Sequence, residues 1–549
     1  MTAALALALL LAQPALTPAE AAAQAAVTEA SLRADTRFLA SDLLEGRGPG
    51  TRGDRLAQEF LATQLAGMGL EPAAPGGGFL QKVPLVAIEA RPPARFTFRS
   101  GKRRLDLRGW DDVVAVPGVQ ASVAEVKDAE LVFAGYGITA PEYGWDDFKI
   151  DVRGKVLLVM NSDPEDDPAL FEGKRRTYRG RWSYKYEEAA RHGAAGVVII
   201  HTTPSAAYPW KVVQTSWTKD SFELPAAGEP RVQLRAWATE EASRRLAALG
   251  GHDLDALRAA AQRRDFRPVP LGVRLSARIE STLRTTESAN VLARLPGRDP
   301  ALAQEVVVHT AHHDHLGMRR GARPGEDAVY NGALDNATGC AAVLAMARAY
   351  RALPEPPRRS VIFALVAGEE QGLLGSEWLA AHPPVPVSRI AAVLNVDGLL
   401  PFGRVRDLVV GGLGKSSLDA MVAEVARVQG RTMVGDLFPD RGSYYRSDQF
   451  SFAKQGVPAI DLRGGIDFVG RPEGWGRKVG DEWLAHHYHQ TSDEYDDDWD
   501  FSGIAEDARA VFLVGRRVAE AEEMPRWNPG DEFEAARQRS LQGAGTGSR

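Results

Sequence analysis

Three short apolar runs in the second half of the chain end in clusters of ionisable residues. The runs cover residues 306–308, 361–366 and 390–394. A continuous apolar run bounded by polar residues is typical of a strand that is buried on both faces of a parallel sheet. The carboxyl ends of such strands share one edge of the sheet, where open α/β sheets bind ligands. The pattern therefore predicts an α/β domain with a functional site at that edge.

The first half of the chain shows a different sequence of patterns. Apolar residues at helical spacing predict mostly helix in residues 29–70, and alternating runs predict antiparallel strands in 79–116. Further apolar runs and a helical segment predict a separate small mixed domain that ends near residue 278. The sequence thus divides into residues 1–23, a cleaved leader; 24–118, the first part of the main domain; 119–278, an inserted α+β domain; 279–525, the rest of the main domain; and 526–549, a polar, glycine-rich tail that we expect to be disordered.

An apolar stretch of leucine and alanine occupies residues 3–12. It is shorter than the ~20 apolar residues of a membrane-spanning helix, and its position is typical of a secretory signal peptide cleaved between Ala15 and Ala23. No lysine or arginine precedes Arg33, so either the signal is atypical or the true start lies upstream. No other window resembles a membrane span. We expect a mature protein without a membrane span, located in a periplasm or secreted.

Composition narrows the class of protein. The 549 residues are too many for one core, and the chain is 44% hydrophobic and 25% charged, as globular proteins are. A net charge of -6 gives no electrostatic footprint for nucleic acid or an anionic membrane. The single cysteine, Cys340, excludes an intrachain disulfide and lies in an apolar helical run, so we expect it in the core.

The residues that follow the three apolar runs are those that bind metals. His312 and Asp314 follow the first run, the pair Glu369 and Glu370 follows the second, and Asp397 follows the third. Imidazole and carboxylate groups are ligands of zinc and similar divalent metals. Two adjacent buried acids repel each other unless a cation lies between them. One glutamate would then bind the metal while its neighbour acts as a general base, and Asp314 is a candidate to hold the other ring nitrogen of His312.

Two further segments add candidates. Asp335 lies in a glycine-bracketed loop before a predicted helix, where it could equally cap that helix. The cluster at residues 486–489 contains three histidines and is equally compatible with a surface position. Within it, His489 offers an imidazole and Tyr488 a hydroxyl for a developing oxyanion, while Asp493 is available to support them. Together these clusters predict a metallohydrolase.

Five motifs occur in a definite order and at comparable spacing. They are His312-x-Asp314, residues 332–336, residues 368–370, residues 395–398 and Tyr488-His489. This series resembles the M28 family of co-catalytic zinc aminopeptidases, and residues 119–278 look like the protease-associated (PA) domain inserted in many of them. The resemblance implies a zinc-exopeptidase-like (phosphorylase/hydrolase-like) α/β core, in which helices flank a mixed central sheet.

The resemblance also implies a role for each candidate residue. Two zinc ions, or other divalent transition metals, would share a water that is activated for attack on peptide substrates. The implied ligands are His312 and Asp397 on one ion, Glu370 and His489 on the other, and Asp335 bridging both; Glu369 is the general base, Tyr488 the oxyanion donor, and Asp314 and Asp493 are supporting residues. The expected reaction is the removal of N-terminal residues from peptides.

Three alternatives remain open at this stage. A non-catalytic receptor or scaffold of the same fold would be expected to have lost ligands, whereas all five are present here. A carboxypeptidase for acidic C-terminal residues would need a basic pocket, for which the chain offers Arg404, Arg406, Arg441, Arg446 and Arg463. A single-metal glutaminyl cyclase shares the core fold, but His312 and Asp335 favour two metals. A loop over the site is expected at residues 464–484.

Overall fold

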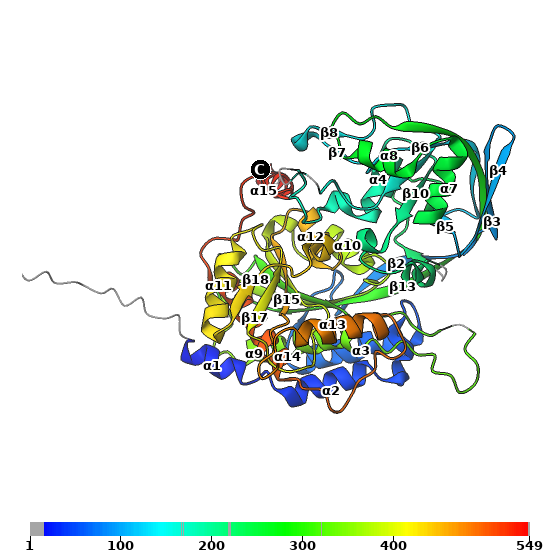
Figure 1. Cartoon of the computed structure of the whole chain (residues 1–549). Coiled ribbons are helices and arrows are strands. Elements are labelled where there is room, and N and C mark those ends of the chain that lie inside the picture. Colours follow the sequence, from blue (N-terminus) through cyan, green and yellow to red (C-terminus); the bar gives the residue numbers. More distant parts are fainter. Residues whose placement is uncertain (1–15, 166, 168–169, 218–220, 320, 547–549) are drawn as a thin grey trace, which may run out of the picture. The chain divides into compact units, whose positions relative to one another are not determined.

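The computed structural model describes residues 16–546, apart from 166, 168–169, 218–220 and 320 (Figure 1). The predicted signal peptide therefore falls largely outside the described residues. The chain divides into two compact units. The first contains the residues up to Val83, Glu287–Leu437 and the residues from Ser447 onwards, and the second contains Pro84–Thr286 and Phe438–Arg446.

A mixed sheet forms the centre of the first unit. Four strands are parallel to one another: β15 (Ser360–Val366), β14 (Val306–His312), β16 (Ile390–Asn395) and β19 (Ala459–Gly464), in that order. On one side, β13 (Val269–Leu295) pairs antiparallel with β15, and β1 (Glu71–Pro72) pairs with β13. On the other side, β17 (Asp407–Gly411) pairs antiparallel with β19, followed by β18 (Thr432–Val434). Strands β14, β15 and β16 contain the three predicted apolar runs, and every residue in them is buried.

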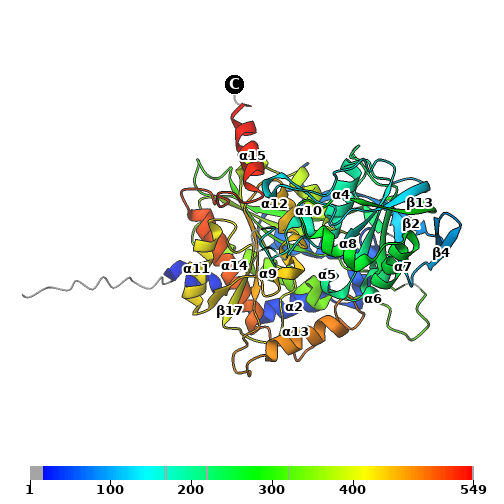
Figure 2. The ribbon, with the colours of Figure 1, turned by 45° about the horizontal axis from the view of Figure 1, so that its top comes forward.

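Helices cover both faces of this sheet. Figures 1 and 2 show α2 (Glu29–Leu39), α9 (Thr338–Arg351) and α14 (Ser502–Glu520) on one side, with α10 (Leu374–Ala381) and α12 (Gln449–Lys454) on the other. The unit is completed by α1 (Pro18–Gln24), η1 (Asp42–Arg47), α3 (Arg52–Gly67), η4 (Ala333–Ala337), η5 (Val387–Arg389), α11 (Leu418–Gln429), α13 (Trp475–His486) and α15 (Glu534–Thr546).

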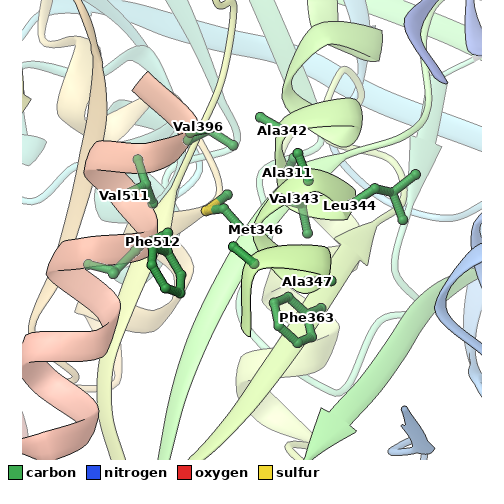
Figure 3. Close-up of a cluster of buried hydrophobic side chains, with 14 of the residues drawn as sticks. Ala311, Ala342, Val343, Leu344, Met346, Ala347, Phe363, Val396, Val511 and Phe512 are labelled. Atoms are coloured by element: carbon green, nitrogen blue, oxygen red, sulfur yellow. The ribbon is translucent and has the colours of Figure 1, made fainter. Parts of the chain in front are cut away.

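The core of the first unit lies where α9 packs between the sheet and α14. Figure 3 shows Met346 of α9 between Phe512 of α14 and the strand residues around Phe363, and all three side chains are fully buried. Cys340 is also fully buried in α9, as predicted. The predicted fold class, an α/β core with a mixed central sheet flanked by helices, is confirmed.

A second sheet organises the other unit. Strands β6 (Val123–Phe133), β9 (Val156–Met160), β10 (Gly196–His201) and β12 (Leu234–Thr239) are parallel neighbours. Antiparallel strands extend both edges: β5 (Val113–Pro117) beside β12, and β13, β3 (Arg95–Ser100) and β4 (Arg103–Arg108) beside β6. Two shorter pairings join β2 (Leu80–Arg91) to β11 (Ser221–Glu223) and β7 (Thr139–Ala140) to β8 (Trp145–Asp146).

Alternate residues of this sheet enter two apolar cores. Leu131 and Phe133 face one core, where α7 (Glu240–Gly250) and α8 (Leu254–Ala261) pack. Val132, between them in β6, faces the other core, where α4 (Trp182–Arg191) packs. This alternation follows from the two-residue period of a strand. Short helices α5 (Thr203–Ala206) and α6 (Trp210–Ser216) and the turns η2 (Pro141–Tyr143) and η3 (Tyr178–Gly180) complete the unit.

The structure differs from the predicted segment boundaries. The second unit begins at Pro84 rather than residue 119, because β3 and β5 pair with β13 and β12 of that unit. It ends at Thr286 rather than 278 and also includes residues 438–446, which the sequence did not suggest. The predicted boundary at residue 23 lies inside α1, where Ala23 is fully buried.

Two segments are more ordered than predicted. The tail at 526–549 was expected to be disordered, but Trp527 and Phe533 are buried, and residues 534–546 form α15. Arg537 of this helix donates hydrogen bonds to the carbonyl oxygens of Val387 and Ile390, at 3.1 and 3.0 Å. The predicted loop at 464–484 contains most of α13. In the described part of the chain, no helix is both long and apolar enough to span a membrane.

Candidate metal centre

The ends of three adjacent parallel strands bring the predicted site residues together. His312 is the last residue of β14 and pairs in register with Val366 of β15. After β15 the chain turns at Gly368, which has φ +66°, and presents Glu369 and Glu370. Asp397 follows β16 on the other side of β14. The carboxyl edge of the sheet therefore positions these side chains, as the apolar runs predicted.

Asp335 reaches the same edge from the loop before α9. Both carboxylate oxygens of Asp493 accept hydrogen bonds from this loop, at 3.0 Å from the backbone N of Leu334 and 3.1 Å from that of Asp335. The side chain of Asn336 donates to the carbonyl oxygen of Val396 at 3.1 Å and accepts from the N–H of Gly339. The side chain of Asn336, and not that of Asp335, thus accepts a hydrogen bond from the first turn of α9, so Asp335 is not the cap of this helix.

Asp335 divides its two oxygens between two imidazoles. Its Oδ1 lies 3.3 Å from Nε2 of His312, which lies 3.3 Å from Oδ1 of Asp397. Its Oδ2 lies 3.4 Å from Nε2 of His489, which lies 3.1 Å from Oε2 of Glu370. All five predicted ligand residues therefore form one cluster with Asp335 at its centre.

A sixth residue, His315, belongs to this cluster and was not predicted as a ligand. Its side chain is fully buried, and its Nδ1 lies 2.7 Å from Oε1 of Glu370. Ligand atoms of His315, Asp335 and Glu370 lie within 4.8 Å of one another, as do those of His312, Asp335 and Asp397. The dense run of histidines at 312–315 was the available signal, but no spacing rule distinguishes His315 from His313.

The segment after α13 supplies the third imidazole. His489 has φ +57°, a backbone conformation that is uncommon for non-glycine residues and recurs at functional sites. The ring of Tyr488 stacks on the ring of His489, with centroids 3.9 Å apart. His486 is exposed, and His487 is held by the carbonyl oxygen of Ser492 at 2.9 Å. Of the three histidines in this segment, only His489 joins the cluster.

The charges in the cluster shift one another's pKa values. Burial raises the pKa of Asp335, but His312 and His489 outweigh it and hold this pKa well below its usual range. Burial lowers the pKa of His489, but Glu370 and Asp335 outweigh it and raise the value to about 10. Burial raises the pKa of Glu369 well above its usual range; His312 opposes this shift, while Asp397 and Glu370 add to it.

The acids exceed the imidazoles in number, and several buried polar atoms are unsatisfied. In the described residues, four atoms of the cluster are buried without a hydrogen-bond partner: Nδ1 and Nε2 of His315, Oε1 of Glu370 and Nε2 of His489. These atoms are close to one another but do not meet hydrogen-bond geometry. Divalent cations would satisfy such atoms and offset the excess negative charge. The side chains therefore fit a metal centre with two adjoining ligand groups that share Asp335.

Hydrogen bonds from neighbouring residues fix the ligands. Asp314 accepts from the backbone N–H of Glu369 at 3.0 Å through Oδ1, and its backbone oxygen lies 3.2 Å from Nδ1 of His312. The hydroxyl of Ser447 donates to Oδ2 of Asp397 at 2.7 Å. Asp314 thus contacts Glu369 and His312, and Asp493 contacts the loop that carries Asp335. Partners of this kind set the orientation of metal ligands.

Arg47 is a supporting residue that the sequence did not suggest. Its guanidinium is buried and donates to the carbonyl oxygens of His313 at 2.8 Å and Gly332 at 2.9 Å, and also to those of Asn331 and Leu39. It therefore ties η1 to the loop after β14 and to the loop before α9. These two loops carry His315 and Asp335, and the first of them begins directly after His312.

Part of the chain is similar to known peptidases. The model of peptidase family M28 matches residues 290–512. Leucine aminopeptidase 1 of Trichophyton rubrum is 30% identical over 147 residues, which cover 26% of this chain and 36% of the fungal protein. This chain thus matches little more than a third of the length of that relative. The match to peptidase family M28 thus covers residues 290–512, which are less than half of the chain.

The M28 segment contains all the ligand candidates, from His312 to His489. A solved structure, an aminopeptidase from Aneurinibacillus sp. strain AM-1, aligns with a TM-score of 0.53 at 18% identity and covers 92% of this chain and 97% of that chain. An M28 peptidase precursor from Shewanella amazonensis SB2B aligns with a TM-score of 0.47 at 17% identity, over 93% of this chain and 99% of that one. The first of these alignments supports the shared fold.

Proposed function

We propose that this protein is a metallo-aminopeptidase that removes N-terminal residues from peptides. The observation that carries the proposal is the position of Asp335, which faces both His312 and His489 and is shared by both ligand groups. Glu369 lies beside these groups but belongs to neither, so it is available for proton transfer. The match of residues 290–512 to peptidase family M28 and the likeness to leucine aminopeptidase 1 favour an aminopeptidase over other hydrolases.

The proposed ligands are those that the family resemblance implied. His312 and Asp397 would hold one zinc ion, Glu370 and His489 the other, and Asp335 both. When bound, the two ions would neutralise the excess carboxylate charge and polarise the scissile carbonyl group. His315 lies within reach of the second ion through its contact with Glu370.

The chain's own residues would carry the proton transfers. Glu369 would accept a proton from the attacking water and deliver it to the leaving amine. Its backbone N–H is fixed by Asp314, which orients the carboxylate. Tyr488, whose ring rests on His489, would donate its hydroxyl hydrogen to the carbonyl oxygen as negative charge develops there. Carboxylates at the edge of the cluster can also bind the α-ammonium group of the substrate.

The carboxypeptidase alternative loses support from the pairing of its candidate arginines. Arg404 binds Glu506 at 3.0 Å, Arg406 binds Asp467 at 2.7 Å, and Arg463 is paired with Asp461. These side chains are therefore not available to form a basic pocket. Arg441 lies over the ring of Phe438, and Arg446 is considered below.

We propose further that the protein is exported and that residues 84–286 are a PA-like insertion. The packing of α1 refines the expected cleavage site. Glu20 is 1% exposed and forms an ion pair with Arg517, so removal of this helix would take away one of the two carboxylate partners of that arginine. We expect the mature chain to begin between Ala15 and Pro18, which N-terminal sequencing of the exported protein would test.

Metal analysis combined with turnover of aminoacyl-anilides tests the proposed function. We expect about two metal ions per chain. Glu369→Gln should keep both ions and lower kcat by about 10²–10⁴-fold, the range of general base catalysis. His489→Ala should lose metal, whereas His486→Ala, an exposed neighbour, should not. A folded, metal-free and inactive protein would support the scaffold alternative, and turnover restricted to C-terminally acidic peptides would support the carboxypeptidase.

A further inference from the structure

Three arginines of the second unit act on one tyrosine, because the charges of Arg446, Arg181 and Arg176 all oppose the rise that burial causes in the pKa of Tyr208. Arg181 immediately precedes α4, and Arg446 is the last residue of the segment 438–446. The guanidinium carbon of Arg446 lies 5.8 Å from the centroid of the Tyr208 ring. Arg176 packs against the same segment, since its Cδ lies 3.1 Å from the position that a Cβ on Gly442 would occupy. Its backbone N–H also donates to Pro439 at 3.0 Å.

These arginines have no carboxylate partner among the described residues. Arg176 is only 6% exposed, and its Nε is buried without a hydrogen-bond partner. The Nε of Arg181 is buried and unsatisfied in the same way. No ion pair joins Arg176, Arg181 or Arg446 to any carboxylate in the described parts of the chain. A buried guanidinium without an acceptor is unfavourable, so the cluster is incomplete as it stands.

The three positive charges also repel one another. Burial, together with the charges of Arg446 and Arg176, lowers the pKa of Arg181 to about 9. Three acids attract the charge of Arg176 without forming an ion pair with it, and the strongest attraction comes from Asp163, ahead of Asp440 and Glu165. The nearest of them is already engaged, because Oδ2 of Asp163 accepts hydrogen bonds from the backbone N and hydroxyl of Thr177 at 2.9 and 2.6 Å.

The start of α4 adds to the positive potential. No side chain caps this ten-residue helix, and Arg181 occupies its N-cap position. The first N–H groups of the helix therefore lack a side-chain acceptor at its positive end, which is an arrangement that favours anions. Guanidinium groups bind carboxylates through paired hydrogen bonds. Helix and arginines together thus favour a carboxylate ligand.

We propose that Arg176, Arg181 and Arg446 form a binding site for a carboxylate group of a peptide. The chain connects this site to the metal centre, since Arg446 is followed directly by Ser447, which donates its hydroxyl hydrogen to Asp397. The proposal adds a second binding site to the proposed function and rests on that function only for the peptide nature of the ligand. It implies that the second unit by itself binds peptides that bear a carboxylate.

Peptide binding to the metal-stripped full-length protein tests this proposal by calorimetry. Removal of metal with a chelator prevents carboxylates from binding at the metal centre. Three tetrapeptide probes are compared: tetra-alanine amide, which has no carboxylate; tetra-alanine as the free acid, with a C-terminal carboxylate; and an amide with one glutamate, with a side-chain carboxylate. We expect at least one of the two carboxylate peptides to bind at least tenfold more tightly than the neutral amide.

Variants identify the residues responsible. Arg181→Gln and Arg446→Gln should each weaken binding of the carboxylate peptide about tenfold or more, as loss of a charged hydrogen bond does. Arg441→Gln is the matched control, because Arg441 lies in the same segment but stacks on Phe438 at 4.0 Å. Circular dichroism checks that each variant is folded.

Several results would overturn the proposal: equal binding of all three peptides, an equal loss in Arg441→Gln, or no loss in the other two variants. Inorganic phosphate that binds more tightly than either carboxylate peptide would also overturn it. Anilide hydrolysis is measured separately with metal present, so failure of the peptidase function and failure of this site are distinguishable.

Discussion

The two buried charged clusters of this protein, one in each unit, balance their charges differently. At the metal centre, every imidazole that joins the cluster lies within about 3.5 Å of a carboxylate, and acids outnumber bases. In the arginine cluster, all three side chains carry the same sign and none has a carboxylate partner among the described residues. The first cluster therefore favours cations and the second favours an anion. In each case the unsatisfied atoms indicate the charge of the ligand.

Arg47 differs from the arginines of the second cluster because its hydrogen bonds are satisfied within the fold. It is as deeply buried as any arginine described, yet four carbonyl oxygens accept its hydrogen bonds. A buried arginine with a full set of acceptors has a structural role. Arg176 and Arg181 lack such acceptors, which is why they are candidates for ligand binding.

Of the substitutions considered, removal of the carboxylate of Asp335, which both metal groups share, should have the largest effect on metal content and activity. In Asp335→Asn, both metal groups lose a charged ligand oxygen at once, and each of His312 and His489 keeps only one of its two carboxylate partners. We expect loss of bound metal and a fall in anilide turnover of at least about 10³-fold, as removal of a group central to electrostatic catalysis produces. Elemental analysis and steady-state kinetics measure both quantities. Retention of both ions in this variant would contradict the bridging role.

Substitution of the satisfied arginine should lower stability. Arg47→Met removes the donors of four buried carbonyl oxygens, and leaving buried acceptors unpaired costs about 1–3 kcal/mol each, so the free energy of unfolding should fall by about 3 kcal/mol or more. Chemical denaturation measures this change. Arg52→Met is the control: Arg52 is 62% exposed and pairs with Glu45, so its loss should change stability by about 0.5 kcal/mol or less. Equal changes in the two variants would argue against the structural role.

Loss of the residue that holds the Asp335 loop should weaken metal binding without abolishing it. Asp493→Asn replaces one of two accepting oxygens by an amide that faces a backbone N–H, so the loop loses its orientation. We expect metal affinity to fall by about 10–100-fold, as for other outer partners of metal ligands. Chelator competition measures the affinity. Asp497→Asn, an exposed neighbour, should bind metal as the wild type does.

The smallest predicted effect is a gain in stability rather than a loss. Arg181→Met removes one of three repelling charges, so the free energy of unfolding of the ligand-free protein should rise by about 0.5–1 kcal/mol, a modest value because Arg181 is only half-buried. Addition of the carboxylate peptide should stabilise the wild type but not this variant. Thermal unfolding with and without the peptide measures both changes. Destabilisation of the ligand-free variant would show that Arg181 already has its partner within the fold.

Local patterns predicted much of the fold and of the metal centre. The apolar runs of β14, β15 and β16 are long enough, and clearly enough bounded, to predict buried parallel strands and hence a shared carboxyl edge. The ionisable residues that follow each run needed no other information to be placed at that edge. The motif series also indicated peptidase family M28, whose model matches residues 290–512.

Contacts between distant segments could not be predicted in this way. The strands in residues 84–117 look the same in sequence whichever sheet they join, so the domain boundary was placed too late. Arg537 holds the predicted tail in place because the carbonyl oxygens of Val387 and Ile390 accept its hydrogen bonds. Arg47 resembles any arginine of a turn-rich loop until its acceptors, almost 300 residues away in sequence, are known.

The sequence by itself determined which strands are buried, which residues follow them and therefore the chemical character of the metal centre, because apolar periodicity and motif order are local properties. Only the tertiary structure decided that His315 joins that centre and that His486 and His487 do not. It also decided that Arg446 lies close enough to Arg176 and Arg181 for its charge to lower their pKa values. Whether a polar side chain is satisfied depends on acceptors that lie far along the chain, and the fold alone brings these together.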